Sequence, residues 1–502
     1  MTKPTTIALS ANAVISAIDE RLYGSFIEHM GRAVYTGIYE PSHPTANEAG
    51  FRQDVIDLIL PLAPSVIRYP GGNFVSGYRW EDGVGPKAER PVRLDLAWQA
   101  LEPNQVGTNE FMGFLESIDS KPMYAVNLGT GSAQDAANLL EYCNFPGGTH
   151  YSDLRIAHGY PNPHNIKLWC LGNEMDGPWQ ICAKTAEEYG RIAHETAKMM
   201  RLIDSEIELV ACGSSFRAMP TFGEWERTVL RHTYEDIDYL SLHTYYQNNE
   251  GDIPAFLANN IRMNHFIKEV RDICEEIKKE KGSEKEVKLA FDEWNVWYHF
   301  QKDGKEPPKW IEARPVEEED YDFADALLVG SMLITLINNA DFVKIACLAQ
   351  LVNALAPIMT QPGGKAWAQT TYYPFLYTSQ RGRGTALQAD VNAASYTCAD
   401  GVEIPFVDCA AVLSEDGGEL TLFLVNKNLE ADIPCELALD GLACAEVLEW
   451  VTMCGFPFDA VNTPEHAPIA PSMHDGSVAL DKDALRFILP KASWNMIRLN
   501  LV

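Results

Sequence analysis

The sequence lacks the cysteine and histidine patterns that would indicate a disulfide framework or a metal centre. Its 11 cysteines stand singly, and no two form a C-x-x-C pair, which argues against both a zinc ribbon and a small oxidised domain. The 12 histidines include no H-E-x-x-H motif. We therefore expect a protein of the reducing cytoplasm that contains no metal.

Positive charge, long apolar runs and nucleotide-binding loops are also scarce. The 40 basic and 70 acidic residues give a net charge of −30, which repels phosphate backbones and anionic lipid. The longest apolar-rich run, residues 326–337, falls short of the roughly 20 residues that cross a bilayer. No signal peptide, G-x-G-x-x-G motif or Walker lysine motif occurs. We expect no nucleic-acid partner, no membrane partner and no cofactor.

The composition is that of an ordinary globular protein, with 46% apolar and 22% charged residues. A chain of 502 residues is longer than the roughly 250 to 300 at which a single hydrophobic core stops growing. Between residues 22 and 353, β-rich runs alternate with stretches of helical period, as in parallel strands joined by helices. The expected strands are 22–29, 65–71, 122–130, 166–174, 207–215, 238–246, 287–295 and 343–352. The expected helices include 52–62, 133–142, 185–202, 261–281 and 321–337. Eight such units predict a (β/α)₈ barrel.

After about residue 383 the pattern changes to alternating strands with turn signals. The dipeptide Asp416-Gly417, for example, separates two apolar runs, which is typical of an antiparallel hairpin. Residues 1–20 also have the pattern of a strand, and a strand that precedes the barrel most easily joins the C-terminal sheet. We therefore predict an α/β protein with three segments: 1–20 joining a β-sandwich, 21–382 forming the barrel, and 383–502 completing the antiparallel sandwich.

Carboxylates end two of the expected barrel strands. Strand four ends in Asn173 and Glu174, and strand seven ends in Glu293, with Trp297 close behind it. Catalytic groups of such barrels lie at the carboxyl ends of the strands, and we expect strands four and seven to face each other across the barrel axis. Two facing carboxyl groups are what glycoside hydrolysis requires. A single glutamate at a strand end could equally be a solvated residue or a helix cap, but two of them among aromatic side chains favour a catalytic pair.

Other strand ends carry side chains that suit a hydroxyl-rich ligand, because they offer paired donors and acceptors together with apolar ring faces. These residues are Glu28, Arg68, Asn73, His243, Tyr245 and Gln350. Each has an alternative interpretation when taken singly. His243 and Tyr245 could be satisfied core groups, and Gln350 could cap backbone groups.

Six ordered motifs resemble those of the α-L-arabinofuranosidases of glycoside hydrolase family 51. They are YGSFIEHMGRAVYTGIYE, RYPGGNFVSGYRWEDG, LGNEMDGPWQ, SLHTYY, DEWNVWY and AQLVN, and the resemblance covers nearly the whole chain. It implies an exo-acting, retaining hydrolase of terminal α-L-arabinofuranosyl residues, with Glu174 as acid/base and Glu293 as nucleophile. Further implied roles are ring binding by Glu28, Asn73, Asn173, Tyr245 and Gln350, support by Arg68 and His243, and a subsite wall from Trp297. The family also implies a homo-oligomer, commonly a hexamer. Tyr69 stands where many members have Trp before PGGN, but an aromatic ring remains.

The residues leave three alternative functions open, and one long connection is expected to contact the substrate. The same barrel could serve an endo-β-glycanase or a β-xylosidase, because the carboxyl pair sets the chemistry while loops set the substrate. A non-catalytic sugar-binding protein would be expected to have lost one of the two glutamates. Residues 301–320 form a long connection on the catalytic face, so we expect them to help close the substrate pocket, with Trp310 as a candidate contact. Whether the substrate is arabinan, arabinoxylan or a short arabino-oligosaccharide is left open by the residues.

Overall fold

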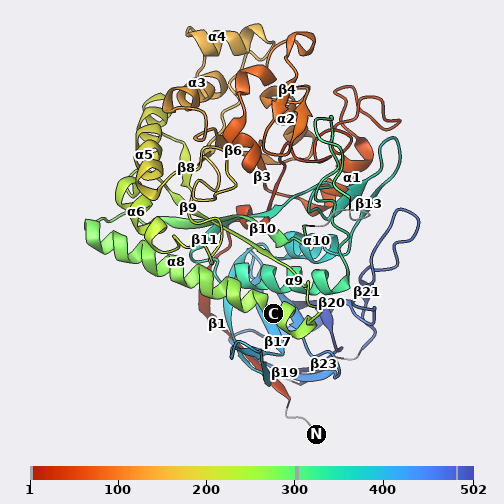
Figure 1. Cartoon of the computed structure of the whole chain (residues 1–502). Coiled ribbons are helices and arrows are strands. Elements are labelled where there is room, and N and C mark those ends of the chain that lie inside the picture. Colours follow the sequence, from red (N-terminus) through yellow and green to blue (C-terminus); the bar gives the residue numbers. More distant parts are fainter. Residues whose placement is uncertain (1–3, 300–304, 477, 482–483) are drawn as a thin grey trace.

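Eight parallel strands close into a barrel in the computed structural model, which describes residues 4–299, 305–476, 478–481 and 484–502 (Figure 1). The barrel strands are β2 (Gly24–Phe26), β3 (Val66–Tyr69), β6 (Lys121–Val126), β7 (Leu168–Leu171), β8 (Glu208–Ala211), β9 (Tyr239–Tyr246), β10 (Lys288–Val296) and β11 (Val343–Ala349). They neighbour each other in chain order, and β11 pairs with β2 to close the ring. Each strand lies within one of the eight predicted runs or extends one residue beyond it. The predicted (β/α)₈ barrel is therefore confirmed.

Helices surround the barrel; α1 to α9 lie between consecutive barrel strands, and α10 follows the last one. They are α1 (Gln53–Leu62), α2 (Thr108–Ser117), α3 (Ala133–Asn144), α4 (His150–Ala157), α5 (Ala186–Ile203), α6 (Glu224–Thr233), α7 (Ile253–Leu257), α8 (Asn259–Lys281), α9 (Phe323–Ile337) and α10 (Tyr372–Arg381). The five predicted helices are present with ends shifted by at most two residues. Strands β7 and β10 are three places apart with β8 and β9 between them, so they face each other across the mouth without being diametrically opposed. No helix within the described residues is long and apolar enough to cross a membrane.

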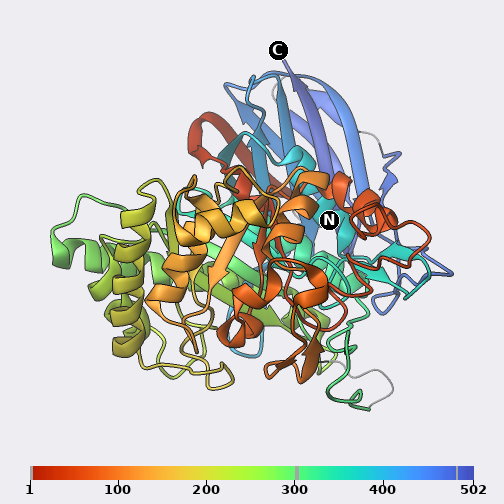
Figure 2. The same ribbon diagram turned by 90° about the horizontal axis from the view of Figure 1, so that it is seen from above.

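A ten-stranded sheet forms the second part of the molecule and packs beside the barrel (Figures 1 and 2). In sheet order its strands are β21 (Ser472–Met473), β20 (Cys444–Met453), β24 (Ser493–Leu501), β18 (Glu419–Asn426), β17 (Val407–Leu413), β14 (Thr385–Asn392), β1 (Thr5–Ala17), β19 (Ile433–Asp440), β23 (Ala484–Leu489) and β22 (Ala479–Asp481). β1 runs antiparallel to β14 but parallel to β19, so the sheet contains one parallel pair. The hairpin between β17 and β18 turns through Gly417 at a φ of 72°, as the Asp-Gly dipeptide predicts.

Helix α9 connects the two parts of the molecule. All 15 of its residues are buried, because the helix packs between α8 and α10 of the barrel and strands β17, β18 and β24 of the sheet. A Cβ atom on Gly330 would lie 2.3 Å from the Trp494 ring, so the glycine permits this close packing. The longest apolar run of the sequence is thus the centre of the interface between barrel and sheet.

Two long connections lie on the catalytic side of the barrel. One follows β3 and contains the hairpin β4 (Arg93–Asp95) and β5 (Ala100–Glu102). The other follows β10 and is described from residue 305 onward. Backbone hydrogen bonds join them, from Trp310 N–H to the Gln99 carbonyl and from Leu101 N–H to the Ile311 carbonyl. A further hairpin, β12 (Ile358–Thr360) and β13 (Ala366–Ala368), follows β11.

Candidate active site

Glu174 and Glu293 lie together at the mouth of the barrel, and oxygen atoms of their carboxyl groups lie within 4.8 Å of each other. Glu174 follows β7 in a tight turn with a φ of 42°, and its carbonyl accepts a hydrogen bond from Gly177 N–H at 2.8 Å. Trp179 Nε1 donates to Glu174 Oε2 at 2.6 Å. A left-handed backbone at a non-glycine residue costs on the order of 1–3 kcal/mol, and here it ends the strand beside the site.

A bulge in β10 brings two adjacent acidic residues to the same side of the strand. Successive strand residues normally face opposite ways, but the pairing of β10 with β9 is irregular between Ala290 and Glu293. Asp292 Oδ2 and Glu293 Oε2 therefore both contact Arg68, at 3.0 Å from Nε and 2.9 Å from Nη1. Trp294 instead packs fully buried in the hydrophobic core. Bulges of this kind re-aim side chains near active sites.

His243 lies among three carboxyl groups. Its Nδ1 atom is 2.9 Å from Glu174 and 3.6 Å from Glu293, and its Nε2 atom is 3.3 Å from Asp292. Burial opposes a charge on the imidazole, but these carboxyl groups together raise the pKa of His243 to about 10. Burial would likewise raise the pKa of Asp292, yet Arg68 and His243 hold it below its usual range. His243 and Arg68 therefore stay positively charged at neutral pH, and Asp292 stays negatively charged.

Hydrogen bonds from the surrounding side chains orient Glu293 and Asn173. Tyr245 donates its hydroxyl to Glu293 Oε1 at 2.7 Å, and Arg68 Nη2 donates to Asn173 Oδ1 at 2.6 Å. Burial raises the pKa of Glu293. The positive charge of His243 opposes this increase, whereas the neighbouring Glu174 carboxylate adds to it. The Trp297 ring packs edge-on against Tyr245, with ring centroids 4.9 Å apart. Five of the predicted residues therefore form one contiguous group around the two glutamates: Arg68, Asn173, His243, Tyr245 and Trp297.

Glu28 and Gln350 lie just beyond the ends of the neighbouring strands β2 and β11. Glu28 Oε1 accepts hydrogen bonds from the Phe74 backbone at 2.8 Å and from Trp98 Nε1 at 3.0 Å. Burial raises the pKa of Glu28 to about 8, so its carboxyl group is mostly protonated at neutral pH. Gln350 Oε1 accepts from the Glu28 backbone N–H at 2.8 Å. In this structure Gln350 therefore makes the backbone cap that was the alternative interpretation of this residue.

Asn73 lies at the start of the 3₁₀ helix that follows β3. Its Nδ2 atom makes one long contact, 3.4 Å, with the Trp179 carbonyl. Its Oδ1 atom is buried and has no hydrogen-bond partner among the described residues. An unpaired buried carbonyl is costly, and this oxygen is consequently an acceptor available to a ligand hydroxyl.

The connection after β10 contacts the site at two points. Glu317 Oε2 accepts from Trp297 Nε1 at 2.7 Å, and Arg314, which is buried, donates to the Trp98 carbonyl at 2.8 Å. Trp98 in turn contacts Glu28, as described above. Trp310 is 42% exposed, and its backbone N–H donates to the Gln99 carbonyl of the preceding hairpin. Of the predicted segment 301–320, residues 301–304 lie outside the described residues.

Glu174, His243 and Glu293 are close enough to be considered as metal ligands. Histidine binds metal through a neutral nitrogen, whereas the raised pKa keeps His243 protonated and its Nδ1 atom already contacts Glu174. This donor set fits an internal ion-pair network better than a metal centre.

Three residues of the site were not predicted. Asp292 precedes Glu293, and the alternation of a regular strand would place these two side chains on opposite faces. Trp98 lies in a loop 70 residues from its partner Glu28, which leaves no local signal. Trp179 lies in the LGNEMDGPWQ motif, where its proximity to Glu174 could have indicated it. Its ring stacks on Phe216 at a centroid distance of 5.8 Å.

A parallel barrel with two closely spaced carboxyl groups at its mouth, among tyrosine, tryptophan and amide side chains, defines a glycoside hydrolase. Comparison with known proteins identifies the family. The model of the α-L-arabinofuranosidase 1 domain matches residues 58–261, and that of the α-L-arabinofuranosidase C-terminal domain matches residues 292–493. The chain belongs to the α-L-arabinofuranosidases of glycoside hydrolase family 51.

Three relatives illustrate this membership. The chain is 52% identical to an intracellular exo-α-(1→5)-L-arabinofuranosidase of Halalkalibacterium halodurans over 99% of both chains. It is 45% identical to an exo-α-(1→6)-L-arabinofuranosidase of Bifidobacterium longum, over 96% of this chain and 95% of the relative. A solved family 51 structure from Bifidobacterium longum superposes with a TM-score of 0.94 at 40% identity, covering 99% of this chain and all of the other.

Proposed function

We propose that this enzyme releases terminal non-reducing α-L-arabinofuranosyl residues with retention of anomeric configuration, using Glu293 as nucleophile and Glu174 as acid/base. The observation that supports this mechanism best is the spacing of the two glutamates, whose oxygens lie within 4.8 Å. Retaining glycosidases place their carboxyl groups about 5–5.5 Å apart, whereas inverting enzymes need about 6.5–9.5 Å to admit a water molecule.

The reaction then proceeds in two displacements. Glu293 attacks the anomeric carbon while Glu174 donates a proton to the departing glycosidic oxygen, which gives a covalent glycosyl-enzyme. A water molecule next attacks this ester, and Glu174 accepts its proton. Asn173 is a candidate partner of the 2-hydroxyl, a contact that strengthens as the ring becomes oxocarbenium-like.

The charges of the site favour one shared proton on the two glutamates. Arg68 and His243 carry two positive charges, and three carboxyl groups contact them, those of Glu174, Asp292 and Glu293. A buried cluster is least costly when its charges balance, and Asp292 is held ionised. The proposed roles place this proton on Glu174 and require an ionised Glu293. The contact of Glu293 with the Arg68 guanidinium supports the ionised form against the burial that raises its pKa.

The arabinofuranosyl ring is assigned to the remaining polar groups. Glu28, Asn73 and Tyr245 offer hydrogen bonds, and Trp297 offers an apolar wall. Gln350 contributes through its amide nitrogen, since its oxygen is occupied by the Glu28 backbone. Relatives named for α-(1→5) and α-(1→6) linkages are both similar to this chain, so a panel of linkage-defined arabino-oligosaccharides is needed to rank the linkages. Aryl xylosides and aryl β-glucosides in the same panel test the rival activities.

Azide rescue tests the assigned roles. Glu174→Ala should lose at least about 10²-fold of its activity on substrates with poor leaving groups. It should still form the glycosyl-enzyme from a nitrophenyl arabinofuranoside, whose leaving group needs little protonation. Azide attacks that intermediate without a general base, so turnover should recover and yield an arabinofuranosyl azide of the substrate's own configuration.

Glu293→Ala is the matched variant. It lacks the nucleophile, so even an activated substrate should stall, and rescue by azide must proceed by one displacement to the opposite anomer. NMR of the azide products distinguishes the two outcomes. A retained azide from Glu293→Ala together with an inverted one from Glu174→Ala would show that the roles are reversed.

We further propose that the protein acts in the cytoplasm on arabinosides taken into the cell. This proposal is supported by relatives from Halalkalibacterium halodurans and Bacillus subtilis, which are named intracellular exo-α-(1→5)-L-arabinofuranosidases. Fractionation of cells that produce the protein, followed by activity measurement in each fraction, tests this location.

A further inference from the structure

A cavity of about 420 Å³ lies at the junction of the barrel and the sheet. Its walls come from the β12–β13 hairpin, from residues 318–320 and from the loop 462–465. Its lining includes Arg32, Glu318, Met359, Trp367, Asn462 and Glu465. None of the predicted site residues lines this cavity, and its volume falls within the range of roughly 300–1,000 Å³ typical of small-molecule sites.

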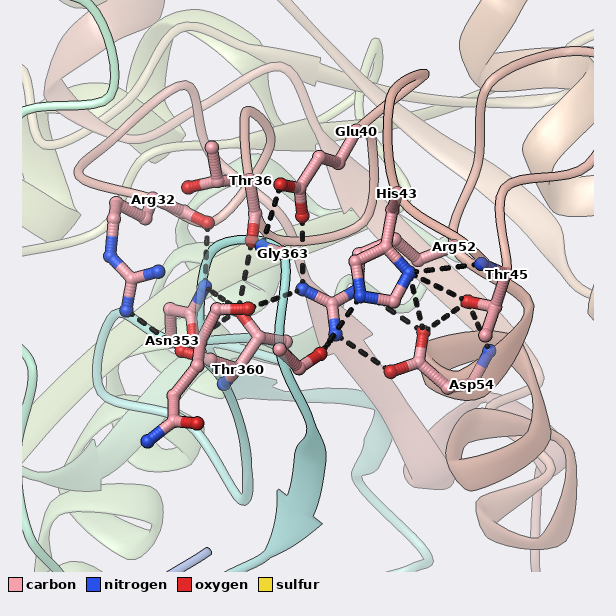
Figure 3. Close-up of polar contacts among 12 residues, drawn as sticks. Arg32, Thr36, Glu40, His43, Thr45, Arg52, Asp54, Asn353, Thr360 and Gly363 are labelled. Carbon is pink, nitrogen blue, oxygen red and sulfur yellow. Dashed lines mark hydrogen bonds and ion pairs between the residues drawn. The ribbon is translucent and has the colours of Figure 1, made fainter.

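A buried network keeps one wall of this cavity in place. Arg52, which is fully buried, donates to the carbonyls of Gln361 and Gly364 at 2.9 and 2.7 Å. Glu40 contacts Arg52 at 3.1 Å and accepts from Gly363 N–H at 2.8 Å. Figure 3 shows these contacts converging on the turn of the hairpin from the segment 32–54. A wall fixed in this way needs little ordering when a ligand binds.

Arg32 is the unsatisfied group of the cavity. Its Nε atom lies 2.5 Å from Glu318 Oε1. Its Nη2 atom donates to the Thr360 carbonyl at 3.0 Å (Figure 3). Nη1 is buried and has no partner among the residues that the structure describes. The residue as a whole is only 9% exposed. An unpaired buried guanidinium nitrogen is costly, which points to a ligand acceptor at this position.

The lining residues restrict the chemistry of that ligand. Glu318, Asp320 and Glu465 oppose an anion, and the one cationic group, Arg32, is already paired with Glu318. The remaining lining combines the apolar surfaces of Trp367 and Met359 with amide and hydroxyl groups. Carboxylates and a guanidinium that pair with hydroxyl groups, next to an aromatic side chain, suit a neutral polyhydroxylated ligand.

We propose that this cavity is a second, non-catalytic saccharide site that binds arabinofuranosyl units of an oligosaccharide. The assignment of the sugar rests on the proposed function. Through Glu318 the cavity neighbours Glu317, which holds Trp297 of the catalytic site. A saccharide bound in the cavity should therefore lower the KM for arabino-oligosaccharides. The KM for a small aryl glycoside should stay unchanged.

Calorimetric titration of α-(1→5)-linked arabinotriose into the full-length inactive variant Glu293→Gln tests this proposal. We expect two binding sites per chain. In the same background, Thr463→Trp should fill the cavity and remove one site, and Trp367→Leu should weaken that site by about tenfold or more. Thr397→Trp, on the exposed strand β15 (Ser395–Thr397) of the sheet region, is the matched control and should retain both sites.

Each cavity variant also needs a check of folding, because Trp367 donates to the Asn462 carbonyl at 3.2 Å. In the active enzyme, both variants should keep wild-type kcat and KM on a nitrophenyl arabinofuranoside while KM for the trisaccharide rises. One site in Glu293→Gln, or two sites that neither cavity variant affects, would overturn the proposal. Binding of 1,4-diaminobutane at this site in place of the trisaccharide would overturn the ligand class. Failure of the wild type to cleave any arabinofuranoside would instead contradict the proposed function.

Discussion

At the scale of single residues, the charge of His243 depends on three carboxyl neighbours. Their effect raises its pKa to about 10, against about 6.5 in the unfolded chain. The folded protein therefore holds a proton that the unfolded chain has lost between these two values. The stabilisation from this charge is complete below about pH 6.5 and is lost as the pH rises through about 10.

We predict that Asp292→Asn weakens the dependence of folding stability on the charge of His243. Removing one partner of a buried ion pair should destabilise the protein by about 3–5 kcal/mol at pH 7, and the pKa of His243 should fall. The alkaline limb of the pH–kcat/KM profile should then move to lower pH. Urea unfolding at pH 7 and pH 9.5, together with the pH–rate profile, measures both effects.

Asp272→Asn, on the exposed side of α8, is the control for Asp292→Asn and should leave both measurements within error of the wild type. An alkaline limb that stays in place in Asp292→Asn, with stability lost equally at both pH values, would show that Asp292 acts through packing alone.

At the scale of elements, the connection 305–320 joins two sides of the active site. We predict that Arg314→Ala releases it from Trp98, because Arg314 donates to the Trp98 carbonyl and contacts Glu306 at 2.8 Å. Trp98 would then lose its fixed position beside Glu28. We expect KM to rise by about tenfold, with a smaller change in kcat, since ring binding is affected more than the reacting groups.

Lys309→Ala is the matched control, because Lys309 also contacts Glu306 but is 46% exposed in its side chain. It should leave KM unchanged, as exposed ion pairs contribute little. Trp310→Ala tests the predicted substrate contact separately. Unchanged kcat and KM on every oligosaccharide would remove Trp310 from the pocket without affecting the argument for Arg314.

The N-terminal strand β1 is the second element with a measurable contribution. Ile7 is fully buried in the core of the ten-stranded sheet, whereas Val14 on the same strand is 54% exposed. We predict that Ile7→Ala lowers the free energy of unfolding by about 2–5 kcal/mol, and that Val14→Ala changes it by less than about 0.5 kcal/mol. Chemical unfolding followed by tryptophan fluorescence gives both values, and equal losses would contradict the observed register of β1.

At the scale of the whole molecule, we predict a homo-oligomer, by analogy with the family a hexamer. The chain mass is 55.9 kDa, so light scattering at micromolar concentration should give a multiple of this value. The monomer mass, measured at physiological ionic strength, would contradict the prediction.

The sequence by itself determined the barrel, the sheet and the two glutamates. Each barrel strand is a short apolar run whose period identifies it locally, and parallel strands place their carboxyl ends at one mouth. Glu174 and Glu293 could therefore be paired although 119 positions separate their numbers, 174 and 293. The family motifs added the assignment of roles to this pair.

Only the tertiary structure decided which polar groups are paired and which are left free. The bulge that turns Asp292 toward Arg68, the parallel pairing of β1 with β19 and the contact of Gln350 with the Glu28 backbone all depend on register between distant segments. The same holds for the cavity beside Arg32, whose walls come from four separate stretches of chain. Periodicity is a local property, whereas hydrogen-bond partners and cavities are set by the packing of remote segments, which no local pattern encodes.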